Sequence, residues 1–148
     1  MTDYAMLIKQ AEELLKDCPW EITGYANLSA LIFASLDDLN WAGFYLIRNG
    51  ELVLGPFQGK IACTHIPVGK GVCGTAVLEN RIVRVEDVHA FPGHIACDSA
   101  SESEIVLPIH KDGKVIGVLD IDSTKKGRFS QEDETGLHRI VQLIETQK

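Results

Sequence analysis

The sequence is short of positive charge. Lysine and arginine contribute 14 residues against 21 aspartates and glutamates, which gives the 148-residue chain a formal net charge of −7. A protein that binds nucleic acid neutralises phosphates with a basic stripe or patch, and this composition offers none. We therefore expect no nucleic-acid partner.

Long apolar runs are missing as well. No stretch approaches the roughly 20 apolar residues of a membrane-spanning helix, and the first residues show no basic segment followed by an apolar one. These absences predict a cytoplasmic protein with no membrane partner. Because thiols are kept reduced in that compartment, the four cysteines, at positions 18, 63, 73 and 97, are expected to be free, metal-binding or catalytic.

Internal repeats and low-complexity tracts are absent too, and the length fits a single domain over residues 1–148. Apolar residues at helical spacing predict helices over 5–16 and 22–36. A terminal helix follows Ser130, which forms a capping-box pattern with Asp133. Its apolar stripe consists of Leu137, Ile140, Val141 and Ile144.

Two dipeptides mark β-hairpins in the middle of the chain. Asn49-Gly50 joins predicted strands 41–48 and 51–57, and Asp112-Gly113 joins SEIVLPIHK to KVIGVLDID. The shorter expected elements are a strand over 63–68, a helix over 72–78, a strand over 81–87 and an irregular stretch over 88–101. Hairpins in the middle and helices at both ends predict an α+β domain, an antiparallel sheet with helices packed beside it.

The irregular stretch and the strand after it contain HIACDSASESEIV, which sets Cys97 among small and acidic residues. A packing cysteine usually has apolar neighbours and a reactive one has positive neighbours, yet this one has neither. Reversible thiol chemistry needs only that Cys97 reach a second thiol after oxidation, and Cys63 or Cys73 could supply it. Cys73 starts an apolar helical turn and is expected to be buried, whereas Cys18, before Pro19, is expected to be incidental.

Two other kinds of site have partial sequence signals. Residues 69–74 match the glycine spacing of a dinucleotide loop, but the strand before them is short and lies among antiparallel hairpins rather than in a βαβ unit. Zinc could use cysteine and histidine side chains, but their spacing is not that of a zinc knuckle. The residues concerned are Cys63, His65, Cys73, His94 and Cys97. We expect neither a metal nor a cofactor.

Three acidic residues lie near the ends of the second hairpin. Asp120 and Asp122 are two residues apart in one strand and face the same side of the sheet. Counting outward from the Asp112-Gly113 turn pairs Glu104 with residue 121, beside both aspartates. The group is either a solvated strand end or a pocket that receives an ammonium group and holds one carboxyl protonated as a general acid.

The stretch IPVGKGVCGTAVLENRIVRVEDV, followed by GVLDIDS, resembles a GAF domain, an α+β fold that binds small molecules. More narrowly, Cys63, Cys73 and Cys97 in their settings, with NWAGFY upstream and VLDIDS downstream, resemble the free methionine-(R)-sulfoxide reductases. The resemblance extends from about residue 5 to residue 144.

The resemblance implies reduction of free L-methionine-(R)-sulfoxide in defence against oxidative stress. It implies that Cys97 is the nucleophile and forms a sulfenic acid, that Cys63 resolves it as a disulfide recycled by thioredoxin, and that Cys73 is auxiliary. Trp41 is expected to contact the S-methyl group of the substrate. The acids expected to bind the amino group and the sulfoxide oxygen are Glu104, Asp120 and Asp122, with Glu104 or Asp122 as proton donor. The family also suggests a homodimer.

Two other hypotheses compete with the assignment of reductase activity. A non-catalytic GAF-type sensor would bind a small ligand without needing cysteines. A redox switch would form a disulfide between Cys63 and Cys97 with an oxidant but would turn over no sulfoxide.

Overall fold

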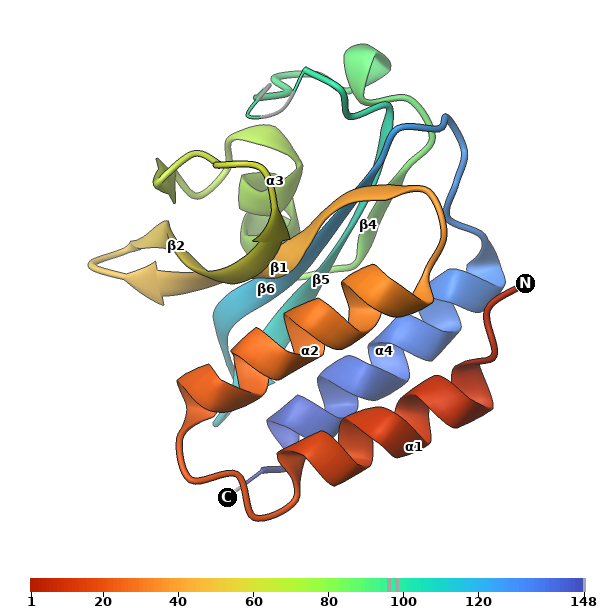
Figure 1. Cartoon of the computed structure of the whole chain (residues 1–148). Helices are drawn as coiled ribbons and strands as arrows, with labels where there is room; N and C mark the ends of the chain where they lie inside the picture. Colours follow the sequence, from red (N-terminus) through yellow and green to blue (C-terminus); the bar gives the residue numbers. More distant parts are fainter. Residues whose placement is uncertain (96, 98, 148) are drawn as a thin grey trace.

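The computed structural model describes residues 1–95, 97 and 99–147. These residues form one six-stranded antiparallel sheet with α-helices on both faces, which confirms the predicted α+β class (Figure 1). The strands lie in the order β3-β2-β1-β6-β5-β4. Within this part of the chain, no helix combines the length and apolar character needed to cross a membrane.

Three long helices cover one face of the sheet (Figure 1). They are α1 (Tyr4–Leu15), α2 (Glu21–Ser35) and α4 (Gln131–Glu145). The predicted capping box at the start of α4 is confirmed, because the Ser130 hydroxyl and the Asp133 carboxylate each accept a hydrogen bond from the other residue's backbone N–H. The shorter α3 (Gly71–Glu79) lies on the opposite face.

The two predicted hairpins supply the four central strands. They are β1 (Leu39–Arg48) with β2 (Glu51–Gly59), and β5 (Ser103–Lys111) with β6 (Lys114–Ser123). Both central residues of each turn have positive φ, 53° and 80° at Asn49-Gly50 and 52° and 77° at Asp112-Gly113. Asparagine, aspartate and glycine tolerate this conformation, which is why these dipeptides make tight hairpins.

The edge elements are shorter than predicted. The strand expected over 63–68 is β3 (His65–Ile66), which Pro67 ends because proline has no N–H for the ladder. The strand expected over 81–87 is β4 (Val83–Val85). The expected irregular stretch begins with a short 3₁₀ helix, Val88–Ala90, capped by Asp87. Ala96 and Asp98 of that stretch, and Lys148, lie outside the described residues.

Alternation along the central strands divides the core between the two faces of the sheet. Phe44, Leu119 and Ile121 point toward α1, α2 and α4 and are fully buried there. Trp41, Tyr45 and their neighbours point the other way, under α3 and the loops that precede and follow it. Removing a core side chain as large as leucine costs roughly 2–5 kcal/mol, so both layers hold the sheet in place.

Candidate active site

Three neighbouring strands carry the predicted polar residues in one row. Trp41 of β1 pairs with Asp122 of β6, and Asp122 pairs with Glu104 of β5. Asp120 is two residues from Asp122 on the same strand and therefore faces the same side. The indole and three carboxylates thus gather on the α3 face of the sheet, away from the three long helices.

The predicted pairing of Glu104 with residue 121 is wrong by one residue. A β-bulge between Ile109 and His110 shifts the register, so that Glu104 pairs with Asp122 instead. Directly paired residues in antiparallel strands point to the same face, and a shift of one residue turns a side chain to the other face. The bulge therefore places Glu104 on the face of Asp120 and Asp122.

A pocket lies between this face, α3 and the loops that carry two of the cysteines. Its cavity measures about 40 Å³. Six of the seven predicted site residues line it, namely Trp41, Cys73, Cys97, Glu104, Asp120 and Asp122. The seventh, Cys63, follows the lining residues Ile61 and Ala62 in the chain.

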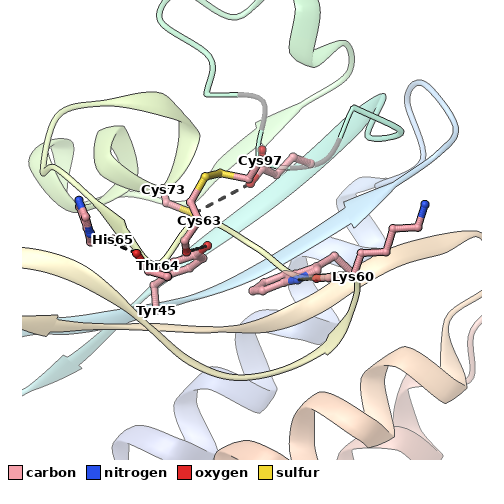
Figure 2. Close-up of a disulfide and its surroundings, with 9 residues drawn as sticks. Tyr45, Lys60, Cys63, Thr64, His65, Cys73 and Cys97 are labelled. Carbon is pink, nitrogen blue, oxygen red and sulfur yellow. Dashed lines mark hydrogen bonds between the residues drawn. A yellow bond between two sulfur atoms is a disulfide. The ribbon is translucent and has the colours of Figure 1, made fainter.

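Cys63 and Cys97 form a disulfide at the edge of this pocket (Figure 2). Their Cα atoms are 5.5 Å apart although 34 residues separate them in the sequence. Cys73 is free and buried, as predicted, with its Sγ 4.0 Å from Glu104 Oε2. Cys18 is also free, but it lies in the loop between α1 and α2, where its thiol donates to the Trp20 carbonyl oxygen, outside the pocket. The tertiary structure therefore brings together the three cysteines singled out as redox candidates.

Burial and mutual repulsion control the protonation of the acids. Burial, followed by the charges of Asp120 and Asp122, raises the pKa of Glu104 well above its ordinary value of 4.5. Burial also raises the pKa of Asp120, but hydrogen bonds from Glu104 and Cys73 partly offset it. The arrangement favours a proton on Glu104 and a negative charge on Asp120.

The thiol of Cys73 shares this environment. Burial, then the charges of Asp120 and Glu104, raise the pKa of Cys73 well above its ordinary value. A thiol that keeps its proton is a poor nucleophile. His94 also lines the pocket, and partial burial lowers its pKa, so this imidazole brings little positive charge to the acids at neutral pH.

The acids and Cys73 are also the group that could hold a cation. Among the described residues, donor atoms of Cys73, Glu104 and Asp120 lie within 4.8 Å of one another. The Oδ1 atom of Asp120 is buried, and it has no hydrogen-bond partner among the described residues. The zinc set considered from the sequence is not brought together in this way, since Cys63 and Cys97 are bonded to each other and the two histidines are not members of the group.

Sequence reasoning missed some residues of the site. Tyr45 lines the pocket, and its hydroxyl donates a hydrogen bond of 2.8 Å to the carbonyl oxygen of Cys63. The sequence could have indicated Tyr45, because residues four apart in a strand have their side chains on the same face and Tyr45 is four residues after Trp41. Lys70 and Ile95 also line the pocket, and their places depend on how the loops fold over the sheet.

Comparisons with known proteins agree with this geometry. The family model for the GAF domain matches residues 25–146. The free methionine-R-sulfoxide reductase of Escherichia coli is 64% identical over 120 residues, which cover 81% of this chain and 73% of that protein. The fRMsr of Staphylococcus aureus in its reduced form superposes with a TM-score of 0.97 at 56% identity, covering 99% of this chain and 96% of that one. For the free methionine-R-sulfoxide reductase of Neisseria meningitidis, solved in complex with its substrate, the TM-score is 0.94 at 42% identity, with 97% and 87% covered.

An antiparallel sheet with a pocket under α3, together with the match over residues 25–146, defines a GAF domain. At these identities and coverages the assignment can be narrower. The chain belongs to the free methionine-R-sulfoxide reductase family of GAF domains.

Proposed function

We propose that this protein reduces free methionine-(R)-sulfoxide to methionine with its own thiols and recovers them from an external dithiol. The observation that carries the proposal is the position of the Cys63–Cys97 pair beside a pocket lined by an indole and three carboxylates. The Escherichia coli relative is named for this activity, and the Neisseria meningitidis relative was solved with its substrate. Both support the assignment.

The pocket suits a free amino acid. Glu104, Asp120 and Asp122 bind the substrate's ammonium group and its sulfoxide oxygen between them, and Trp41 packs against its S-methyl group. A methionine sulfoxide inside a polypeptide has an uncharged amide where the free amino acid has an ammonium group, so it would leave buried carboxylate charge unpaired. Selectivity for the free amino acid follows from that difference.

Reduction begins at Cys97. Its sulfur attacks the sulfoxide sulfur, the sulfoxide oxygen takes a proton, and the products are methionine and a sulfenic acid on Cys97. Glu104 or Asp122 supplies the proton. The raised pKa of Glu104 favours Glu104 for this task, since a general acid must hold its proton until the transition state.

The acidic surroundings of Cys97 then have a physical explanation. In the empty site, carboxylate charge opposes formation of a thiolate. A bound substrate brings its own ammonium group, which offsets that charge. The substrate therefore contributes to activating the thiol that attacks it.

Cys63 and an external dithiol complete the cycle. The Cys63 sulfur attacks the Cys97 sulfenic acid, which forms the disulfide and releases water. A dithiol such as thioredoxin then reduces the disulfide, becoming oxidised itself and restoring both thiols. Because this step needs a reducing compartment, we place the protein in the cytoplasm and in the defence against oxidative stress. Cys73, with its protonated buried thiol, is an auxiliary residue rather than the nucleophile.

We also propose that residues 1–148 form a single domain and that the protein is a homodimer. A single domain over 1–148 includes α1, whose Leu7, Ala11 and Leu15 pack in the helical layer although the family match begins at residue 25. A homodimer through α1 would have to use what those contacts leave exposed, such as Met6. Sedimentation of the purified protein tests the dimer.

The function is tested by offering purified, reduced protein the free R sulfoxide, the free S sulfoxide and a peptide-bound sulfoxide with dithiothreitol. We expect turnover of the free R form alone. A protein that turns over none of them, although its thiols are reduced, is not a reductase. The Cys97→Ser variant should lose turnover, whereas a sensor would keep its ligand binding and a redox switch would lose only its response to oxidant.

A further inference from the structure

The segment 60–64, which carries Cys63, has no regular secondary structure of its own. Three hydrogen bonds from β1 and β2 hold it. The Trp41 indole N–H donates to the Lys60 carbonyl oxygen at 3.2 Å, and the Leu54 backbone N–H donates to the Thr64 carbonyl oxygen at 2.9 Å. The third and shortest, 2.8 Å, runs from the Tyr45 hydroxyl to the carbonyl oxygen of Cys63 itself (Figure 2).

Tyr45 is a firm anchor for this contact. Its side chain is 2% exposed and stacks on the Trp41 ring at 5.8 Å between centroids. It stands in the middle of the central strand β1, which pairs with β2 on one side and β6 on the other. Burial, and then the charge of Asp120, raise the pKa of Tyr45, so its hydroxyl keeps the proton that it donates.

We propose that Tyr45 is a positioning residue for the resolving thiol: its hydroxyl holds the backbone of Cys63 so that the Cys63 sulfur meets Cys97. This inference rests on the proposed function, because it concerns the second chemical step of that cycle. In that step the Cys63 sulfur forms a bond to the Cys97 sulfur, the S–O bond of the sulfenic acid breaks, and the oxygen leaves as water.

The consequence for the reaction is kinetic. Attack of one sulfur on another requires a defined approach, and a segment that samples many conformations spends less time in it. Cys97 itself sits outside any helix or strand, so the sheet can fix only the Cys63 side of the pair. If Cys63 attacks more slowly, the sulfenic acid on Cys97 has a longer lifetime and more of it is irreversibly oxidised.

The test uses Tyr45→Phe, which keeps the ring and its stacking but removes the hydrogen bond. Reduced protein is mixed with one equivalent of substrate and no external reductant, and both methionine release and disulfide formation are followed. Because Tyr45 lines the pocket, the readout is the ratio of the two rates. We expect disulfide formation to slow by roughly 3- to 10-fold relative to methionine release, the scale of one lost hydrogen bond. Dimedone should trap correspondingly more sulfenic acid on Cys97.

Tyr25→Phe is the matched control. Tyr25 is also buried, at 4% exposure, but its ring packs at a tilt of 39° against Phe44 in the helical layer on the opposite face of the sheet. The same loss of a hydroxyl there should leave the ratio at its wild-type value. Oxidising Cys97 with hydrogen peroxide instead of the sulfoxide repeats the measurement without using the substrate pocket.

An unchanged ratio and unchanged dimedone trapping in Tyr45→Phe would overturn the inference while leaving the proposed function intact. Absence of methionine release from the wild type would instead overturn the proposed function. If Tyr45→Phe does not fold, Thr64→Gly tests whether resolution depends on holding this segment, and an unchanged ratio in that variant would also overturn the inference. Thr64 is exposed, and a glycine beside Cys63 frees the same segment, so resolution should slow again.

Discussion

The fold buries Glu104 beside other acids, where the charged form of its carboxyl group is disfavoured. It is 7% exposed and shares its surroundings with two aspartates. Its raised pKa means that the unfolded chain loses this proton at lower pH than the folded chain does. The contribution of Glu104 to stability is therefore complete below its ordinary pKa of 4.5 and is lost as pH rises toward the folded-state pKa.

Glu104→Gln should consequently separate stability from activity. We expect the reduced variant to lose less stability than the wild type between pH 4.5 and neutral pH, because glutamine cannot ionise. Activity on free methionine-(R)-sulfoxide should fall by about 10²- to 10⁴-fold if Glu104 is the general acid. Urea unfolding at several pH values and steady-state turnover measure the two effects.

The exposed Glu13→Gln is the control and should change neither the pH dependence of stability nor turnover. A Glu104→Gln variant whose stability falls with pH as steeply as the wild type's would contradict the assigned direction of the pKa shift. Full activity in that variant would move the proton donor to Asp122.

The two free cysteines should differ in reactivity in the disulfide form. Cys18 is partly exposed, whereas Cys73 is buried and its pKa is raised by burial and by the neighbouring acids. Because the thiolate is the reactive form, iodoacetamide at neutral pH should modify Cys18 and leave Cys73 unmodified in the folded protein. Peptide mass spectrometry locates the label. Equal labelling would show that the Cys73 environment is more open than the structure describes, and unfolding in urea should make both cysteines react.

At the scale of elements, the start of α4 depends on two side chains of unequal importance. Ser130 caps the helix, whereas Asp133 also accepts hydrogen bonds from the Tyr4 hydroxyl at 2.6 Å and from Arg128 at 3.1 Å. Ser130→Ala should lower the free energy of unfolding by about 1 kcal/mol, the usual cost of a lost N-cap. Asp133→Ala should lower it further, because α1 loses its contact through Tyr4. Urea unfolding ranks the two, and the opposite order would contradict the role given to Asp133.

The elements also show how far sequence patterns reach. Helix boundaries and both hairpin turns were predicted to within about two residues because local residues determine them: the capping box at Ser130 and the positive φ of the turn dipeptides. The short edge strands were overestimated, since an edge strand extends only where a partner is present. The bulge between Ile109 and His110 was not predicted, although Pro108 and Gly117 stand beside it and both residue types are common at bulges.

At the scale of the whole molecule, the Cys63–Cys97 disulfide closes a loop with a sequence separation of 34. Closing a loop of this length restricts the unfolded chain, which by chain entropy stabilises the folded protein by roughly 3–4 kcal/mol. The oxidised protein should therefore unfold at a higher urea concentration than the reduced protein. Cys63→Ser, which cannot form this bond, should show one midpoint in both buffers. A reduced wild type as stable as the oxidised form would indicate that native contacts oppose the bond.

The sequence by itself determined the class of the fold, the hairpins, the helices and the residues to consider for chemistry. These depend on periodicity, on turn residues and on side-chain types, which are local properties. The tertiary structure decided what those residues form together. It joined Cys63 to Cys97, placed Trp41, Glu104 and Asp122 in one row across three strands, and raised the pKa of Glu104 by burying it among other acids. Each of these depends on contacts between distant parts of the chain, whose register a single bulge can change.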